Sequence, residues 1–351
     1  MKIETNPFFN KITEALKDEL PFVAYRHPET DTVKGIFQKN DDLHYMSDFS
    51  ESGFVFAPFD DNKPSILFPL TASAIFETNF SDVYTMDGDK HLQWSVSEDS
   101  KTTHINLVQK GIDLLKTTDT KKVVLSRKKI IEYPDLNVIE TFKKLLINYT
   151  NAMVYVWFHP KVGLWMGASP EILLKVQNNL FKTMALAGTQ TYQGSLEVVW
   201  QQKEKQEQQF VTDYIVEKLH KDIIVSDAKT VKAGSLIHLC TSISGKLSEE
   251  FTLFKLINLL HPTPAVCGLP KDEAKTFILK NEGYDREFYT GFLGELNIDR
   301  TSNLFVNLRC MQVLSKELAL YIGGGITRDS NPQKEWEETV AKSKVMLKVL
   351  G

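Results

Sequence analysis

The sequence of 351 residues has no excess of positive charge. Its 41 lysines and arginines stand against 45 aspartates and glutamates, which gives a formal net charge of −4. Non-specific binding to a phosphate backbone requires an excess of clustered cations, so we expect no nucleic-acid partner. The chain also lacks any run approaching the roughly 18 apolar residues that a membrane-spanning helix needs, and we expect no membrane partner.

Cysteine is scarce, and no targeting segment is evident. The three cysteines, Cys240, Cys267 and Cys310, are far apart and odd in number, which indicates free thiols and gives no zinc-binding spacing. The first residues lack the basic and apolar regions of a secretory signal, and residues 8–20 instead follow the pattern of an acidic amphipathic helix. We therefore expect a cytoplasmic protein.

Internal repeats, low-complexity tracts and linkers rich in proline or glycine are also missing. Hydrophobic residues make up 42% of the chain and aromatic residues 11%, which is enough to build a large core. We predict one folded unit over residues 1–351. Within it, residues 1–95 form a more variable N-terminal lobe, and residues 100–350 form the core that carries the motifs described below.

Strand and helix patterns follow one another without a regular alternation. Short apolar runs predict strands over residues 123–125, 153–158, 172–176, 304–313 and 318–322, the last two forming an antiparallel hairpin. Helical spacing predicts helices over residues 104–116, 203–221 and 332–350, the last of them capped by Asp329 or Ser330. Period-two alternation along residues 304–313 places Arg309 on one definite face of a strand. Hairpins interrupted by helices predict the α+β class.

Two pairs of glutamates give the clearest chemical signal. Glu204 and Glu207 begin one predicted helix, and Glu335 and Glu338 begin another. A spacing of three places both carboxylates of a pair on one helix face. Two such faces could share a Mg²⁺ ion, and the absence of accompanying His or Cys disfavours Zn²⁺. The ordinary alternative is that the helix dipole favours glutamates in a first turn.

Two candidate acid–base groups lie at strand ends. Lys122 immediately precedes an apolar strand, where burial would lower its pKa and make it a base. Glu171 lies at a turn that enters another strand, where burial would make it a general acid. The alternative for both residues is a side chain whose charged group is exposed to solvent and has its ordinary pKa.

Three further features also allow two interpretations. Gly323-Gly324-Gly325 is neither a P-loop nor a Gly-x-Gly-x-x-Gly motif, and it either offers amides to an anion or forms a simple turn. Lys342 either binds a ligand or pairs with Glu338 one turn earlier. His261, in a proline-rich turn, is either functional or structural.

Taken in order, these segments resemble the chorismate-utilising enzymes, namely the isochorismate, salicylate, anthranilate and aminodeoxychorismate synthases. The matching motifs are Lys122-Val-Val-Leu-Ser-Arg127, Gly167-Ala-Ser-Pro-Glu171, Leu186-Ala-Gly-Thr189, Lys203-Glu-Lys-Gln-Glu207, His261-Pro-Thr-Pro-Ala-Val-Cys-Gly268, Arg286-Glu-Phe-Tyr-Thr-Gly-Phe-Leu-Gly294, Asn307-Leu-Arg309, Gly323-Gly-Gly-Ile326 and Glu335-Trp-Glu-Glu-Thr339 with Lys342. They follow the family's order over about residues 100–350, so the joint match is specific.

The resemblance implies an anthranilate synthase component I-like fold: α+β, with two large antiparallel β-sheets packed together, helices on the outside and a deep site between the sheets. It implies a Mg²⁺ cofactor bound directly by Glu207 and Glu338, with Glu204 and Glu335 as direct or water-bridged ligands. The ion would hold the ring carboxylate of chorismate. The implied substrate-binding residues are Arg309 and Tyr289 at the enolpyruvyl carboxylate, with Gly323, Gly325 and Lys342; Gly188 and Thr189 beside the ring hydroxyl; and His261.

Two positions distinguish the members of the family. Lys122 stands where the ammonia-using anthranilate synthases have Gln, which favours water as the nucleophile, although aminodeoxychorismate synthases also carry Lys there. The loop that begins at His261 is similar to that of isochorismate and salicylate synthases. The chain departs from the pattern at Gln208, where many relatives have His, and at Gly324, where many have Ala. Gln208 could change the hydrogen bonding around the metal ligand.

The leading hypothesis is therefore an isochorismate synthase, an isomerase in which Lys122 activates water for attack on C2 and Glu171 protonates the departing C4 hydroxyl. The alternatives are salicylate synthase, which the short chain disfavours; anthranilate or aminodeoxychorismate synthase; and a non-catalytic binding protein with solvated glutamates. Chorismate is the expected small-molecule partner. We expect a monomer without a glutaminase subunit, and the next enzyme decides whether the product serves menaquinone or siderophore synthesis.

Overall fold

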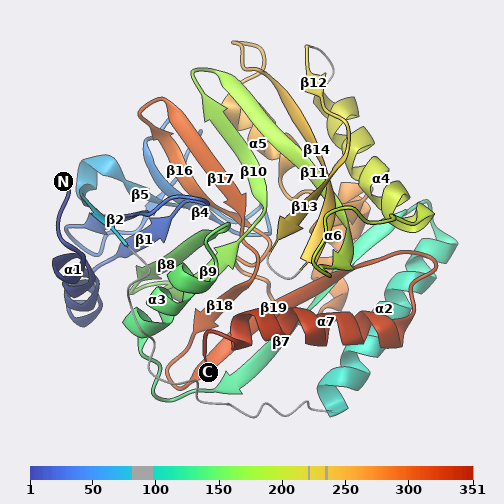
Figure 1. The fold of residues 1–351 in the computed structure, drawn as a ribbon, viewed down its shortest axis with the longest axis horizontal. Helices are drawn as coiled ribbons and strands as arrows, with labels where there is room; N and C mark the ends of the chain where they lie inside the picture. Colours follow the sequence, from blue (N-terminus) through green and yellow to red (C-terminus); the bar gives the residue numbers. More distant parts are fainter. Residues whose placement is uncertain (81–97, 220–221, 234–235, 351) are drawn as a thin grey trace.

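The computed structural model describes residues 1–80, 98–219, 222–233 and 236–350. The described strands form two antiparallel sheets that face each other (Figure 1). In order across the nine-stranded sheet, they are β15 (Gly268–Leu269), β7 (Lys122–Glu132), β19 (Glu317–Ile326), β18 (Cys310–Val313), β9 (Gly163–Ser169), β8 (Met153–His159), β1 (Phe22–Arg26), β2 (Thr32–Gln38) and β6 (Ser73–Asn79).

The second sheet has ten strands within the described residues. In order, they are β12 (Ile224–Val225), β14 (Leu236–Lys246), β11 (Leu180–Thr191), β10 (Ile172–Gln177), β17 (Thr301–Val306), β16 (Phe292–Ile298), β4 (Gly53–Ala57), β5 (Ile66–Pro69) and β3 (His44–Tyr45), with β13 (Lys229–Ala233) beside β14. The predicted α+β fold with two antiparallel sheets is confirmed.

Helices cover the outer faces. They are α1 (Thr5–Lys17), α2 (Glu98–Thr117), α3 (Val138–Asn148), α4 (Gln202–Leu219), α5 (Leu253–Leu260), α6 (Lys271–Asn281) and α7 (Pro332–Leu347), with a short 3₁₀ turn at Leu70–Ala72. The helices predicted at the N-terminus and over residues 104–116, 203–221 and 332–350 correspond to α1, α2, α4 and α7. Among the described helices, none is long and apolar enough to cross a membrane.

Apolar side chains fill three successive layers. One cluster packs α1 and α3 on the outer face of the nine-stranded sheet, and another packs α4 and α5 on the outer face of the ten-stranded sheet. Between the sheets lies an aromatic core. In this core Phe68 stacks on Trp157 at 5.0 Å and Phe56 stacks on Phe288 at 4.2 Å between ring centroids. Trp157 of β8 contacts Phe68 of β5 and, at 4.9 Å, Phe56 of β4, so burial of aromatic surface holds the sheets together.

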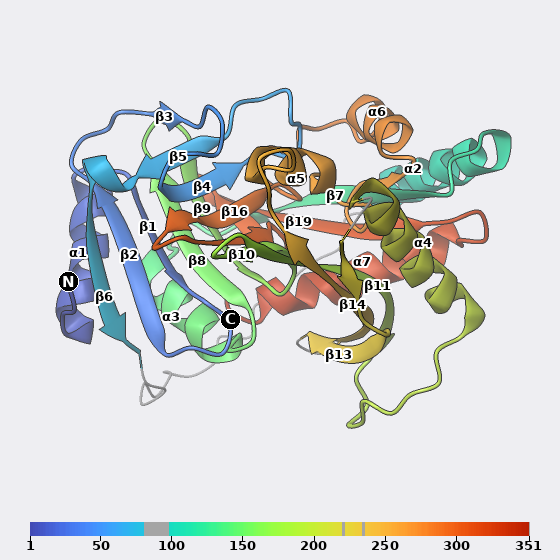
Figure 2. The ribbon, with the colours of Figure 1, turned by 90° about the horizontal axis from the view of Figure 1, so that it is seen from above.

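The N-terminal strands extend both sheets. β1, β2 and β6 continue the nine-stranded sheet, and β3, β4 and β5 continue the other. They lie at one end of the molecule, with α2 and α4 at the opposite end (Figure 2). The N-terminal segment expected to form a lobe is thus continuous with the sheets as far as Asn79, and residues 81–97 lie outside the described part.

Two of the places where the chain passes from one sheet to the other are adjacent in space. β9 belongs to the nine-stranded sheet and β10 to the other, so the chain crosses at Pro170-Glu171. It crosses back between β17 and β18, at residues 307–309. The two crossings are bonded to each other, because the Val306 amide donates to the Glu171 carbonyl at 3.0 Å and the Ala168 amide donates to the Arg309 carbonyl at 3.1 Å.

The second crossing corrects the predicted single strand over residues 304–313. β17 ends at Val306 and β18 begins at Cys310, and Arg309 between them has a φ of 47°, in the left-handed region. Arg309 therefore does not lie on a strand face. The apolar alternation continues through the break because both flanking strands are buried, so the sequence pattern does not reveal the change of sheet.

Two smaller expectations are also wrong. Gly323-Gly324-Gly325 is not a turn, because all three residues lie within β19 and pair with Ser126, Leu125 and Val124 of β7. The cap of α7 is Asn331, whose side chain accepts a hydrogen bond from the Lys334 amide at 3.1 Å. Asn331 directly precedes Pro332, the residue at which α7 begins, which is the usual position of a capping side chain.

Candidate active site

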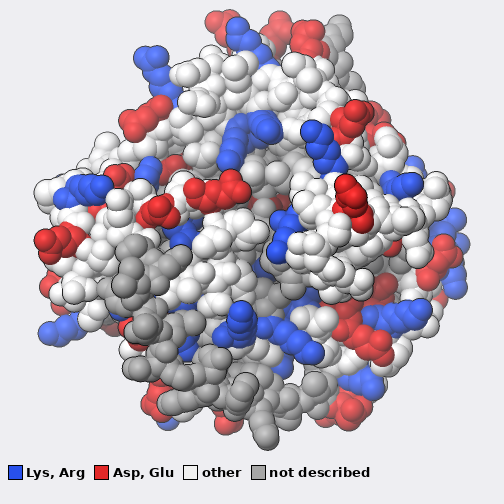
Figure 3. All heavy atoms as spheres, in the orientation of Figure 1, with Lys and Arg blue, Asp and Glu red and all other residues white. Residues whose placement is uncertain are grey.

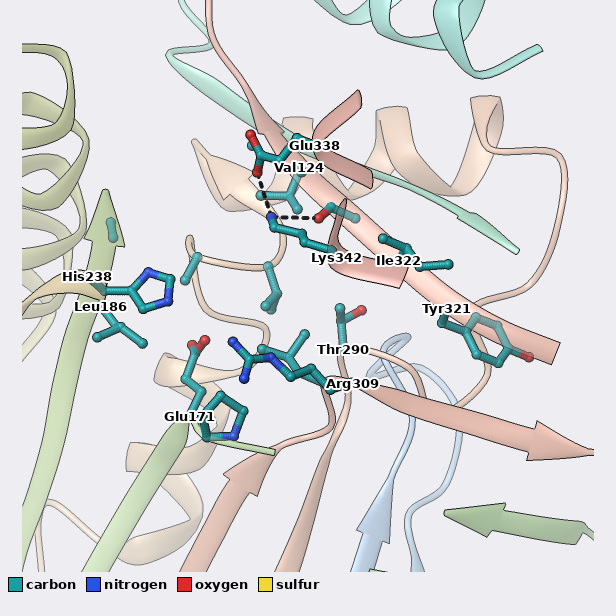
Figure 4. Close-up of a pocket in the computed structure, with 18 of the residues that line it drawn as sticks. Val124, Glu171, Leu186, His238, Thr290, Arg309, Tyr321, Ile322, Glu338 and Lys342 are labelled. Atoms are coloured by element: carbon teal, nitrogen blue, oxygen red, sulfur yellow. Dashed lines mark hydrogen bonds and ion pairs between the residues drawn. The ribbon is translucent and has the colours of Figure 1, made fainter. Parts of the chain in front are cut away.

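A cavity of about 260 Å³ lies where the two sheets diverge beyond their crossings. Its walls come from β7, β19, β11, β14, α4, α7 and the two crossing segments (Figure 4). The predicted residues that line it are Lys122, Glu171, Gly188, Glu204, Glu207, Tyr289, Arg309, Gly323, Gly325, Glu335, Glu338 and Lys342. The structure thus gathers most of the sequence candidates around one space.

Lys122 is the first residue of β7 and is almost completely buried, with 5% of its surface exposed. Burial lowers the pKa of its ammonium group, and the nearby carboxylates of Glu207 and Glu171 partly oppose this effect. Gly325 lies beside it: a Cβ at that position would come within 2.9 Å of Lys122 Cε. The absence of a side chain at Gly325 therefore gives Lys122 room to enter the cavity.

Glu171 and Arg309 come from the two sheet crossings and enter the cavity close to each other (Figure 4). Glu171 is 8% exposed. Burial raises the pKa of Glu171 to about 7, although Lys122 and Arg309 lower it in part. Glu171 is therefore a carboxyl group that can hold a proton near neutral pH, as a general acid must.

Tyr289 and the glycines of β19 form the adjacent wall. Tyr289 stacks on Tyr321 of β19 with 5.3 Å between ring centroids. A Cβ at Gly323 would approach the Tyr289 hydroxyl to 2.8 Å, and one at Gly324 would lie 3.6 Å from Glu335 Oε2. The bare backbone of β19 thus borders four of the predicted functional side chains, namely Tyr289, Glu335, Glu338 and Lys122.

α7 packs against β19 and presents Glu335, Glu338 and Lys342 to the cavity. Lys342 Nζ lies 2.7 Å from Glu338 Oε1 and donates to the Gly323 carbonyl at 3.0 Å (Figure 4). Both interpretations of Lys342 from the sequence are therefore compatible with its position: it pairs with Glu338, and it lines the cavity.

α4 presents the other glutamate pair from across the cavity. The helix approaches β11 at Gly188, whose φ is +71° and where an added Cβ would come within 3.0 Å of Glu204 Cβ. Glu204 Oε2 is buried and has no hydrogen-bond partner among the described residues. A buried carboxylate oxygen without a partner is costly, and a cation would remove that cost.

The four glutamates have the donor chemistry that suits Mg²⁺. They supply oxygen ligands from two helices, and Mg²⁺ typically takes one or two carboxylates together with water and substrate oxygens. Within the described residues, no three acidic, His or Cys side chains converge closely enough to enclose an ion by themselves. The pairs on α4 and α7 would therefore hold the ion together with water and substrate.

Two sequence candidates lie elsewhere or are only partly described. His261 ends α5 and donates from Nε2 to the Pro58 carbonyl at 2.9 Å; it does not line the cavity, which its loop reaches through Ala265 and Val266. The prediction that His261 contacts substrate is thus not supported by its position. The backbone of Thr189 lies in β11, and its side chain is outside the described part.

Gln208 faces away from the cavity. It is buried, and its amide donates to Thr212 Oγ1 at 2.8 Å and to Thr241 Oγ1 at 2.6 Å. These contacts connect α4 to β14 behind Glu207. The hydrogen bonds of Gln208 therefore affect how α4 packs against β14.

His238 is the functional candidate that the sequence interpretation missed. It lies in β14 and faces the cavity opposite Arg309 (Figure 4). Its Nδ1 lies 3.0 Å from the Gly188 carbonyl, and burial lowers the pKa of its imidazole to about 4, so the ring is neutral. The alternation of Ile237, Leu239 and Ile243 with polar residues from His238 onward predicts a strand with one polar face, which would have identified it.

Charges of both signs lie close together on this side of the molecule. Figure 3 shows several Lys and Arg side chains near the centre of the face, with Asp and Glu side chains beside them and around the rim. Inside the cavity, Lys122, Arg309 and Lys342 accompany five glutamates. Acidic groups outnumber basic ones in this lining, so an anionic ligand would need a bound cation beside the glutamates as well as the charge of Arg309.

Comparison with known proteins agrees with this site. Residues 72–351 match the family model described as chorismate binding enzyme. The chain is 28% identical to the isochorismate synthase EntC of Escherichia coli (strain K12) over 315 residues, which are 84% of this chain and 80% of EntC.

Solved structures share the whole fold. A putative 2,3-dihydroxybenzoate-specific isochorismate synthase, DhbC from Bacillus anthracis, superposes with a TM-score of 0.79 at 25% identity, covering 98% of this chain and 99% of that one. Anthranilate synthase component I from Streptococcus pneumoniae gives a TM-score of 0.68 at 18% identity, covering 93% and 92%. The family model spans most of the chain and includes every predicted site residue, and so this protein belongs to the chorismate binding enzyme family.

Proposed function

We propose that this chain is a Mg²⁺-dependent isochorismate synthase, which converts chorismate to isochorismate. The observation that carries the proposal is the pairing of Lys122 and Glu171 in one cavity. Burial lowers the pKa of the first and raises that of the second. A base and an acid whose pKa values both move toward neutrality are what an exchange of hydroxyl groups requires. The relatives named above as isochorismate synthases support the same reaction.

The reaction can be written with these two groups. Neutral Lys122 takes a proton from a water molecule, and the water oxygen forms a bond to C2 of chorismate. The ring double bonds shift, the C4–O bond breaks, and Glu171 gives its proton to the departing oxygen, which leaves as water. One water enters and one leaves, so the product is an isomer of the substrate.

The remaining residues would hold the substrate. Arg309 and Lys342 would pair with the enolpyruvyl carboxylate, and the Tyr289 hydroxyl and the backbone of Gly323 and Gly325 lie on the same side. Bound Mg²⁺, held by the glutamates of α4 and α7, would bind the ring carboxylate and offset its charge. Gly188 and the neutral ring of His238 would lie beside the ring hydroxyl, from β11 and β14.

Variants of the two acid–base residues test the proposal. Lys122→Ala and Glu171→Ala should each lower kcat by a factor of about 100 or more, because general acid–base catalysis typically contributes 10²–10⁴-fold, while Mg²⁺ binding measured by calorimetry persists. Lys121→Ala is the matched control, since Lys121 is the exposed neighbour of Lys122. Turnover near the wild-type rate in either active-site variant would remove the role assigned to that residue.

A further inference from the structure

One buried guanidinium group, that of Arg286, donates hydrogen bonds to three separate segments of the cavity wall. Its side chain is 1% exposed and forms an ion pair with Glu282, whose side chain is completely buried. Arg286 Nε donates to Glu282 Oε2 at 2.7 Å, and Nη2 donates to Oε1 at 2.5 Å. Neither residue lines the cavity.

The other donors of Arg286 go to cavity walls that are far apart in sequence. Nη2 donates to the Val124 carbonyl on β7 at 2.7 Å, and Nη1 donates to the Val266 carbonyl at 3.0 Å and to Thr290 Oγ1 at 3.1 Å. Together with the two bonds to Glu282, this gives each of the five N–H groups of the guanidinium a partner. Val124, Val266 and Thr290 all line the cavity.

Glu282 completes the connection to β7. Its Oε1 accepts the Ser126 amide at 2.7 Å and the Ser126 hydroxyl at 3.0 Å. The pair thus holds β7 at Val124 and Ser126, immediately beyond Lys122, and it holds the turn that carries Tyr289 and Thr290. A buried ion pair adds little net stability compared with apolar groups of the same volume, so stability alone does not account for this arrangement.

We propose that Arg286 and Glu282 are positioning residues of the reaction, whose ion pair fixes the strand bearing Lys122 against the turn bearing Tyr289 and Thr290. The inference rests on the proposed function, since it gives the pair the task of placing the base. A displacement of about 1 Å between reacting groups can cost a factor of 100 in rate. Of the side chains assigned to the enolpyruvyl carboxylate, the pair holds only Tyr289. The two cationic ones, Arg309 and Lys342, come from the second crossing and from α7, so substrate affinity should depend less on the pair than kcat does.

Steady-state consumption of chorismate, whichever product forms, tests this inference. Arg286→Lys keeps the charge but has three donors in place of five. We expect kcat to fall at least tenfold and KM to stay within threefold of the wild type. Glu282→Gln keeps the shape of the carboxylate and should likewise lower kcat while leaving KM nearly unchanged. This variant provides the test if Arg286→Lys does not fold.

Glu295→Gln is the matched control. Glu295 is a buried carboxylate between the sheets that accepts hydrogen bonds from Tyr25 at 2.6 Å and Lys34 at 3.0 Å, and it does not line the cavity. Its variant should lose thermal stability while keeping kcat within twofold. Arg286→Lys and Glu282→Gln with wild-type kcat and only a similar loss of stability would overturn the inference. A wild-type chain that consumes no chorismate would instead overturn the proposed function on which it rests.

Discussion

Glu171 shows how one side chain connects folding to chemistry. It lies where the chain leaves one sheet for the other, and it is buried because the second crossing covers it. Burial favours its neutral form, which is the form that can donate a proton. The same burial makes the ionised carboxylate unfavourable in the folded protein, so the residue that serves catalysis weakens the fold at neutral and higher pH.

The sign of this effect on stability can be tested with Glu171→Gln. The folded protein holds the proton up to a pKa of about 7, whereas the unfolded chain releases it near 4.5. The contribution of the protonated Glu171 side chain to the free energy of unfolding is therefore fully present below pH 4.5 and is lost as pH rises through about 7. The difference corresponds to about 3 kcal/mol. Glu171→Gln should be more stable than the wild type at pH 8 and lose this advantage at pH 4.5, as followed by urea unfolding; a constant difference would contradict the assigned burial.

At the scale of elements, the helices α4 and α7 place the two glutamate pairs, and Gly188 sets the distance between α4 and β11. α4 can approach β11 because Gly188 has no side chain, and the approach brings Glu204 into the cavity wall. α7 lies along the other wall and is held to β7 by Arg127, whose Nε donates to Thr339 Oγ1 at 2.8 Å. Since each glutamate pair comes from a separate helix, the geometry of the ion site depends on how α4 packs against β11 and how α7 packs against β19.

Gly188→Ala tests the seating of α4. The added methyl group would meet Glu204 Cβ at 3.0 Å and the Glu204 carbonyl at 3.2 Å, so the helix must shift, and we expect Mg²⁺ affinity measured by calorimetry to fall at least tenfold. Gly194→Ala is the control, because Gly194 also has a positive φ, of +96°, but nothing lies within 4 Å of an added Cβ. Equal effects of the two variants would show that backbone strain, and not helix displacement, is responsible.

At the scale of the whole molecule, the described parts of the N-terminal and C-terminal regions share both sheets. Phe68 of β5 stacks on Trp157 of β8, which joins an N-terminal strand of one sheet to a central strand of the other. Both side chains are completely buried. Because no described part of the N-terminal region has a sheet of its own, we expect the chain to unfold as one unit.

Phe68→Ala tests this expectation. Removal of a buried phenylalanine ring typically costs about 3–5 kcal/mol. The free energy of unfolding should fall by that amount, and the single unfolding transition should move to lower denaturant concentration. Tryptophan fluorescence and circular dichroism should report the same midpoint, because Trp157, which packs against Phe68, should unfold together with the strands of both sheets. Two separate transitions would contradict the continuity of the sheets and favour an N-terminal lobe that folds independently.

Much of this arrangement could be predicted from the sequence, and the remainder has physical reasons. Glu204, Glu207, Glu335 and Glu338 were found because helical spacing is a local signal. The break before Arg309 was missed because burial on both flanks conceals a change of sheet. The sequence points to His261 and not to His238, because a proline-rich turn is conspicuous in a sequence, whereas the orientation of a strand residue into a cavity depends on long-range pairing.

The proposed reaction is tested most directly by the product that the chain forms from chorismate. Protein, Mg²⁺ and chorismate would be incubated in ¹⁸O-labelled water, with and without ammonium, and the products identified by NMR and mass spectrometry. We predict isochorismate that carries one labelled oxygen, at C2, with no pyruvate released. Salicylate with pyruvate, an aminated product formed only with ammonium, or unchanged chorismate would contradict the assignment.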